Sequence, residues 1–256
     1  MLNAFTGNSI GSIASNPVAQ TDTLLNDYTL IETISCEGLY PMHLQGISTD
    51  KKANLYWSYT DALVKTDLKG KVLNKVNVLN HHGDLCYVEG KIYVAVNLGK
   101  FNLPAGEADS WIFVYDSNNL KEIVRFPIPE LVHGAGGISF NKGLFYVVGG
   151  LPPNIEENYI YAYDRDFKFI KRHVINSGYT RLGIQTIEHH DGHWWLGCYG
   201  SPKLIKTTED YQITEKNDFD ISLGIAGYSN NTILVGTSKA QLNKLHIGSI
   251  SVFRKK

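Results

Sequence analysis

Short runs of alternating apolar and polar residues fill the chain from about residue 28 to its end. The runs are rich in Val, Ile, Tyr and Trp, and turns containing Gly, Asn and Asp separate them. Alternation with a period of two is typical of a strand with one buried face, whereas an amphipathic helix needs a period near 3.6, which no long segment keeps. The pattern therefore predicts an all-β protein.

One unit of four predicted strands recurs along the chain. Its copies cover residues 45–78, 84–126, 137–173, 185–214 and 226–253, and the fourth copy is the weakest. In the first three copies the third predicted strand ends on a matching aspartate: Asp67, Asp116 and Asp164. Their spacings of 49 and 48 residues are close to the period of β-propeller blades.

The fifth copy lacks its fourth strand, whereas a spare strand, residues 28–34, precedes the first copy. Placing the spare strand on the last blade closes the ring and pairs strand edges that would otherwise stay open. A two-sheet sandwich is the alternative, but it gives no reason for five similar units with this surplus and deficit. The sequence therefore predicts a five-bladed β-propeller over residues 28–256, with residues 1–27 as an arm outside the repeat.

Composition narrows the classes of partner. The chain is 43% hydrophobic and 19% charged, which suits a globular protein with a substantial core. Lys and Arg total 24 against 25 Asp and Glu, so a partner bound mainly by charge, such as nucleic acid or a membrane surface, is not indicated. A small-molecule substrate or ligand is expected instead.

Localisation and redox state follow from local features. The N-terminal residues show no signal-peptide pattern and no segment approaches the roughly 20 apolar residues of a membrane span, so the chain as written is expected to be cytoplasmic. It would be secreted or periplasmic if a leader had been removed. The three cysteines, Cys36, Cys86 and Cys198, are expected to be buried free thiols.

The candidate site lies where the innermost strands of the blades begin, because these ends converge on one face of a propeller. In the register of the repeat, the first positions of the inner strands are Gln45, Asp84, Gly136, Gln185 and Ala226. Just before them stand three histidines and an arginine: His43, His82, His133 and Arg181. The sequence thus brings imidazole, carboxylate and amide groups to one axis.

Three interpretations of this convergence remain open. On a strand, His82 and Asp84 point to the same side and His81 points away. The imidazoles of His43, His82 and His133 could hold a divalent metal ion, Zn or Ca. Alternatively, Asp84, His82 and His133 could act as catalytic acid/base groups without metal, or these groups could make structural hydrogen bonds.

Other segments bear on the same face. The loops at residues 97–109, with Lys100 and Phe101, and 238–246, with Lys239, Lys244 and His246, are long enough to cover a binding site, and residues 149–153 are expected to form a third wall. In contrast, residues 189–193, His-His-Asp-Gly-His, fall at a turn of the fourth blade at the far end of the channel. Because Asp-Gly favours hairpin turns, this run is expected to be a surface hairpin.

Two short motifs resemble the plant and bacterial type of glutaminyl cyclase, a five-bladed propeller family. His43-Leu-Gln45-Gly46-Ile47 is similar to the Gln-Gly-Leu opening of one inner strand in that family. His82-Gly83-Asp84-Leu85 is similar to its Gly-Glu-Gly motif, with Asp in place of Glu. The resemblance implies a cyclotransferase with Gln45 and Asp84 in the site and Gln185 as a further inner-strand polar group. Sugar-processing propellers share the same blade layout.

The sequence therefore supports two hypotheses. In the first, the chain is an enzyme, a hydrolase, lyase or cyclotransferase, that acts on a sugar derivative or a peptide end at the channel mouth. The residues expected to bind its substrate are Gln45, Gln185, Arg181, Lys100 and Phe101. In the second, it is a non-catalytic propeller that binds a protein or glycan partner through its loops.

Overall fold

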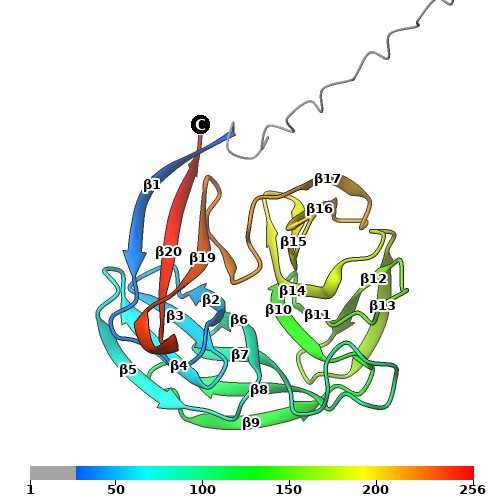
Figure 1. Cartoon of the computed structure of the whole chain (residues 1–256), viewed down its shortest axis with the longest axis horizontal. Helices are drawn as coiled ribbons and strands as arrows, with labels where there is room; N and C mark the ends of the chain where they lie inside the picture. Colours follow the sequence, from blue (N-terminus) through cyan, green and yellow to red (C-terminus); the bar gives the residue numbers. More distant parts are fainter. Residues whose placement is uncertain (1–26) are drawn as a thin grey trace, which may run out of the picture.

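Twenty strands form five four-stranded antiparallel sheets in the computed structural model, which describes residues 27–256. Each sheet is one blade, and the blades surround a central axis (Figure 1). The five-bladed β-propeller expected from the sequence is confirmed. Within residues 27–256, no helix is both long enough and apolar enough to cross a membrane.

Each blade runs from an inner to an outer strand. The first contains β2 (Leu44–Thr49), β3 (Asn54–Tyr59), β4 (Ala62–Asp67) and β5 (Val72–Asn77). The second contains β6 (His82–Val88), β7 (Lys91–Asn97), β8 (Ser110–Asp116) and β9 (Glu122–Pro127). The third contains β10 (Ala135–Asn141), β11 (Leu144–Gly149), β12 (Asn158–Tyr163) and β13 (Phe169–Ile175). The fourth contains β14 (Arg181–His190), β15 (His193–Tyr199), β16 (Leu204–Thr208) and β17 (Ile213–Asn217).

The fifth blade joins the two ends of the repeat region. Its strands β18 (Ile225–Ser229), β19 (Thr232–Ala240) and β20 (His246–Lys255) are completed by β1 (Tyr28–Ser35), which pairs antiparallel with β20. The register runs from Tyr28 opposite Lys255 to Ser35 opposite Ser249, and Figure 1 shows β1 beside the C-terminal strand. Closure of the ring by the N-terminal strand is thus confirmed, while residues 1–26 of the expected arm lie outside the described residues.

The repeated aspartates have a local structural role. The Oδ1 of Asp67 accepts hydrogen bonds from the backbone N–H groups of Lys69 and Lys71, both at 2.9 Å. Asp116 and Asp164 bond the turn after their own third strand in the same way. In the fourth blade, Thr208 holds the corresponding turn: its Oγ1 accepts a hydrogen bond from the backbone N–H of Gln212 at 3.1 Å. A side-chain oxygen is needed to hold each turn, and both Asp and Thr can supply it.

Apolar side chains from neighbouring blades form the core. The largest fully buried side chains include Trp57, Trp194 and Trp195. All three cysteines are buried and free, as expected. Aliphatic side chains such as Ile47, Val147 and Ile233 pack in the same clusters, so aromatic and aliphatic groups share the core between blades.

The inner strands approach one another too closely for side chains at certain positions. A Cβ on Gly83 of β6 would lie 2.3 Å from the carbonyl oxygen of Gly136 on β10. A Cβ on Gly46 of β2 would lie 2.5 Å from the Cα of Asp84 on β6. Glycine at these positions lets three neighbouring inner strands meet around the axis.

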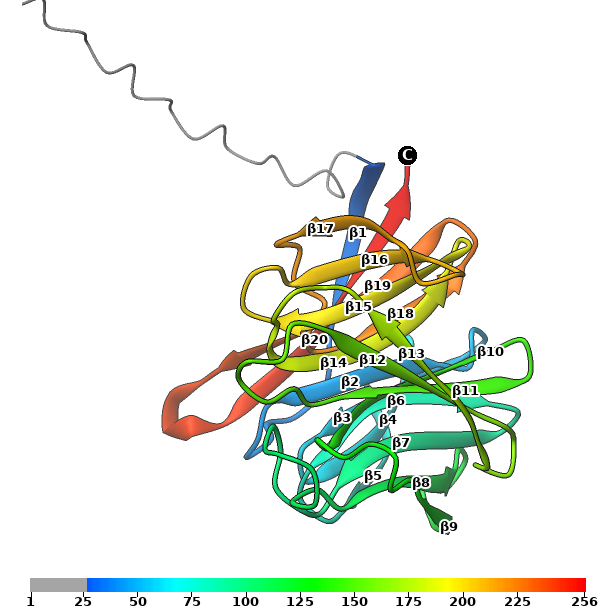
Figure 2. The same ribbon diagram turned by 90° about the vertical axis from the view of Figure 1, so that its right-hand side faces the viewer.

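One expected loop is more regular than its sequence indicates. Residues 238–246 continue the pairing of β19 and β20 into a longer hairpin, and the 3₁₀ turn η1 (Leu242–Lys244) forms its tip. The hairpin projects beyond the neighbouring strands in Figure 2. It is tied to the start of the first blade by backbone hydrogen bonds between Tyr40 and His246 in both directions, at 2.7 and 2.9 Å.

Candidate functional site: a polar cavity at the channel mouth

A cavity of about 590 Å³ opens where the inner strands begin, and is called the mouth cavity below. Its walls come from the first four blades and from the segment that leads into the fifth. The residues that line it are His43, Gln45, His81, His82, Gly83, Phe101, Asn102, Gly136, Arg181, Leu182, Gln185, Tyr199, Gly200, Lys203, Asp220 and Ser222. Of the expected site residues, His43, Gln45, His82, Phe101, Arg181 and Gln185 are brought together here.

β-Bulges explain why Gln45 and Gln185 reach the cavity. In β2, the pairing with β3 skips from Leu44 to Gly46, and in β14, the pairing with β15 skips from Ile184 to Thr186. Gln45 and Gln185 are the extra residues, and a bulge changes the direction of the side chain that it carries. In the third blade Gly136 occupies the same place, because β10 skips from Ala135 to Gly137.

Both amide groups are held in place. The Nε2 of Gln45 donates to the Oγ1 of Thr60 at 3.0 Å and to the Nε2 of His43 at 3.1 Å. The Nε2 of Gln185 donates to the carbonyl oxygen of Leu182 at 2.5 Å. Within residues 27–256 no hydrogen bond involves either side-chain oxygen, so each amide keeps an acceptor for a ligand.

Asp84 lies below the mouth cavity rather than in its wall. The bulge of β6 leaves Gly83 and Asp84 between the paired residues His82 and Leu85, and Gly83 is the one that lines the cavity. From Leu85 onward, β6 lines a smaller cavity of about 90 Å³ toward the other end of the channel. The register that aligned Asp84 with Gln45 is therefore wrong by one residue, and such a shift changes the side to which a strand residue points.

The Asp84 carboxyl is buried among neighbouring inner strands. It is 1% exposed, and its Oδ1 has no hydrogen-bond partner within the described part of the chain. Burial raises the pKa of Asp84 well above its usual value, while nearby backbone N–H groups, Leu85 and Ile187 first, oppose the shift. Burial therefore favours the protonated, neutral form of this carboxyl.

His82 is also more deeply placed than its motif suggests. Its ring is fully buried; the Nδ1 donates to the carbonyl oxygen of Leu79 and the Nε2 accepts from the hydroxyl of Tyr115, both at 2.7 Å. Burial lowers the pKa of His82 to about 4. Both nitrogens of this neutral imidazole are occupied, which is the arrangement of a satisfied core histidine.

His133 supports a loop from outside the mouth cavity. Its Nδ1 lies 2.8 Å from the carbonyl oxygen of Leu103, and its own carbonyl accepts from the N–H of Asn102 at 3.0 Å. The residue lines a different and much smaller cavity with Gly134. Through these contacts it fixes the loop that carries Phe101 and Asn102 into the mouth cavity.

The expected three-histidine metal cluster does not form. His82 has both ring nitrogens engaged, and His133 lines a different cavity from His43. Among residues 27–256, no group of three or more His, Cys, Asp or Glu side chains is close enough together to hold a metal ion. Lys100 does not line the mouth cavity either, because its ammonium pairs with Glu107 at 3.0 Å on the exposed side of the loop.

His43 lines the mouth cavity and, like His82, has a lowered pKa. Burial lowers the pKa of His43, and the positive charge that His246 would carry lowers it further; the two rings lie 6.0 Å apart. Because Gln45 donates to the Nε2 of His43, that nitrogen carries no proton. His43 is therefore a neutral imidazole in the wall.

Six polar lining residues were missed by the sequence analysis: His81, Asn102, Tyr199, Lys203, Asp220 and Ser222. His81 was expected to point away, but its φ of 69° turns its ring toward Phe101, with the ring centres 5.5 Å apart. Tyr199 and Lys203 flank the short connection between β15 and β16. The repeat could have predicted that Tyr199 and Lys203 lie at the cavity. Their connection joins the second and third strands of its blade, as the long loop at residues 97–109 does in the second blade.

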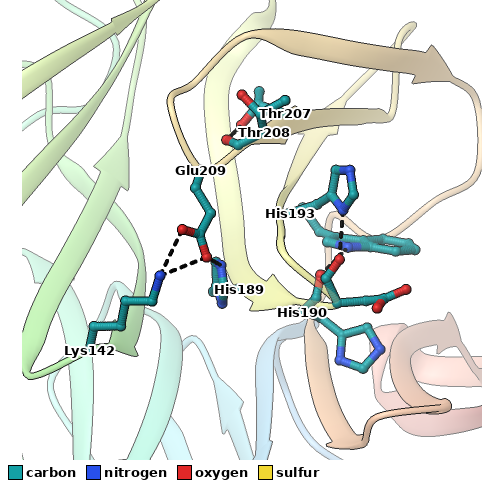
Figure 3. Close-up of polar contacts among 9 residues, drawn as sticks. Lys142, His189, His190, His193, Thr207, Thr208 and Glu209 are labelled. Atoms are coloured by element: carbon teal, nitrogen blue, oxygen red, sulfur yellow. Dashed lines mark hydrogen bonds and ion pairs between the residues drawn. The ribbon is translucent and has the colours of Figure 1, made fainter.

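The run at residues 189–193 forms the expected hairpin turn. His190 ends β14 opposite His193 at the start of β15, and the Nδ1 of His193 lies 2.7 Å from the carbonyl oxygen of Asp191. Figure 3 shows His189 next to Glu209, which also binds Lys142. These contacts join the turns of the third and fourth blades, and none of these histidines lines the mouth cavity.

Comparisons with known proteins support the fold alone. A protein of unknown function from Dyadobacter fermentans DSM 18053 superposes with a TM-score of 0.53 at 11% identity, covering 90% of this chain and 100% of that one. BamB from Moraxella catarrhalis gives a TM-score of 0.38 at 10% identity, with 90% and 98% covered. The WD40 domain of Neurospora crassa Pan2 gives 0.43 at 9% identity, with 83% and 63% covered.

The sequence comparisons add no family. No protein-family model matches the chain, and no curated protein matches it. Nothing in these comparisons points to a glutaminyl cyclase, so the resemblance of the two short motifs supports the propeller fold and no specific activity.

Proposed function

We propose that this propeller binds a small polar molecule in the mouth cavity. The proposal rests on a cavity of about 590 Å³ whose walls come from four blades and the segment before the fifth and include several polar side chains. Sites for small molecules typically have volumes of about 300–1,000 Å³ and a few well-placed polar groups. The inner strands meet closely at Gly46 and Gly83, so a ligand enters and leaves by the mouth.

The two glutamines are the proposed orienting groups. Each Nε2 is already held by a protein acceptor, Thr60 for Gln45 and the Leu182 carbonyl for Gln185. The side-chain oxygens are consequently fixed before a ligand arrives, and ordering them on binding costs little. A hydroxyl or amide N–H of the ligand would donate to them.

In the enzymatic form of the proposal, the protein also converts the bound molecule, and its substrate is a sugar derivative or a peptide end. The acid/base roles expected for Asp84, His82 and His133 stay predictions, since Asp84 and His133 do not line the mouth cavity and both ring nitrogens of His82 are engaged. Binding of a protein or glycan partner through the loops also stays a prediction.

A ligand screen tests the proposal directly. Neutral sugars, sugar acids, amino acids and amino-acid amides are added to the purified chain, stabilisation is followed by thermal shift, and affinities are measured by calorimetry. Gln45→Leu and Gln185→Leu should each weaken binding about fivefold, since a hydrogen bond contributes on the order of 1 kcal/mol. Gln212→Leu, an exposed glutamine after β16, is the matched control.

The proposal fails if no compound stabilises the chain, or if Gln212→Leu weakens binding as much as the two cavity variants. Mass spectrometry of the incubated mixtures separates binding from turnover. A product whose formation depends on Gln45 and Gln185 would identify an enzyme.

A further inference from the structure

One side of the mouth cavity carries an unmatched positive charge. Arg181 at the start of β14 and Lys203 before β16 both line it, and Asp220 is the one Asp or Glu among the lining residues. The ammonium of Lys203 lies 2.8 Å from the Oδ2 of Asp220. The Oδ1 of Asp220 accepts from the hydroxyl of Ser222 at 2.7 Å and from its N–H at 3.1 Å. Both carboxylate oxygens of Asp220 therefore have partners, and the negative charge of Asp220 neutralises the positive charge of Lys203.

Arg181 is left without a counter-ion. No hydrogen bond or ion pair of its guanidinium is found among residues 27–256, and the residue is exposed to the cavity mouth. Its backbone lies opposite Tyr199 in the pairing of β14 with β15, and its side-chain stem passes close to Gly200, where a Cβ would lie 3.5 Å from the Cβ of Arg181. The guanidinium is therefore carried at the edge of the wall that Tyr199 also lines.

Tyr199 adds a neutral donor beside this charge. Burial raises the pKa of Tyr199 to about 12, and the Asp220 carboxylate contributes to the rise, so the hydroxyl keeps its proton at physiological pH. No hydrogen bond of this hydroxyl is found among residues 27–256. An O–H donor, a guanidinium with five N–H donors and an ammonium then face one side of the cavity.

We infer that Arg181, Tyr199 and Lys203 bind the carboxylate of a small organic acid whose neutral polar part lies against Gln45 and Gln185. This inference rests on the proposed function and names the class of its ligand. A guanidinium binds a carboxylate through two parallel hydrogen bonds, and charge-assisted bonds of this kind are about twice as strong as neutral ones. One unmatched positive charge suits a monocarboxylate better than a phosphate dianion.

Matched pairs of ligands test the inference. Glucuronate is compared with glucose, galacturonate with galactose, and an N-acetyl amino acid with its amide, by calorimetry at low salt. At least one acid should bind ten times more tightly than its neutral partner, and the difference should shrink as salt is raised. Arg181→Gln should remove the preference for the acid, and Tyr199→Phe should reduce it severalfold.

The control is Arg254→Gln, which removes the same charge from an exposed position on β20 and should leave the preference intact. The inference is overturned if neutral partners bind as tightly as the acids, if the preference survives Arg181→Gln, or if glucose 6-phosphate outcompetes glucuronate tenfold. Neutral ligands that bind and depend on Gln45 would leave the proposed function standing in each of these cases. Absence of binding by every compound would instead remove the proposed function itself.

Discussion

The Oδ2 of Asp84 on β6 accepts a hydrogen bond from the backbone N–H of Ile187 on β14, at 3.4 Å, across the centre of the ring. The contact links the second and fourth blades, which are not neighbours. Because burial raises the pKa of Asp84, the folded chain keeps a proton that the unfolded chain releases. The stability that this proton provides is complete below the unfolded pKa, about 3.9, and is lost as the pH rises above it.

Asp84→Asn should therefore be at least as stable as the wild type at pH 7. Asparagine has the shape of the neutral acid and does not ionise, so the pH-dependent loss disappears. Urea unfolding at pH 4 and pH 7 measures this, and the gain relative to wild type should be larger at pH 7. Asp166→Asn, at an exposed turn, should show no such difference. A variant that is relatively less stable at pH 7 than at pH 4 would mean that Asp84 is buried as an anion.

Because His82 is buried as a neutral imidazole, the folded chain should lose stability in mild acid. Its folded pKa of about 4 lies below the ordinary value of 6.5, so the unfolded chain takes up a proton first as the pH falls. Stability should decline between about pH 6.5 and pH 4, by on the order of 3 kcal/mol from this group, and then level off. His82→Gln should be less stable at pH 7 but should show a shallower decline. His193→Gln, in the hairpin turn of Figure 3, should keep the wild-type slope; an equal slope in both variants would contradict the assignment.

Gly83→Ala should be among the most damaging single methyl additions in the chain. The new Cβ would meet the Gly136 carbonyl oxygen at 2.3 Å, and neither inner strand can move without disturbing the ring. A loss of more than about 3 kcal/mol or a failure to fold is expected, as for severe overpacking. Gly90→Ala is the control: its φ of +83° costs about 1–2 kcal/mol, but nothing lies within 4 Å of the added atom. Equal melting temperatures for the two variants would show that the inner strands are not packed so closely.

Removal of β1 should open the ring. A chain beginning at Tyr28 keeps every backbone pairing of β1 with β20, whereas a chain beginning at Cys36 leaves the β20 edge unpaired. An exposed edge of seven residues, Ser249 to Lys255, favours association with other chains, so the shorter chain should aggregate and the longer one should not. Light scattering and circular dichroism measure both properties. Monomeric, folded behaviour of the chain that begins at Cys36 would contradict the closure.

The sequence by itself determined the architecture. Alternation, turn residues and the spacing of Asp67, Asp116 and Asp164 are local signals, and each blade repeats them because each must fold the same four strands. The fifth copy lacks an outer strand, and the spare strand at residues 28–34 supplies it, because every blade needs the same four strands. Local hydrogen bonding and strand periodicity suffice for such conclusions.

Only the tertiary structure decided which side chains enter the cavity. Four bulges set the direction of the inner-strand residues, and one residue of register separates Gly83 in the wall from Asp84 beneath it. The burial of His82 against Tyr115 and the approach of Tyr199 and Asp220 depend on contacts between segments far apart in the chain. A repeat fixes where each strand begins; the packing of five inner strands around one axis fixes where its side chains point, because that packing depends on all the blades at once.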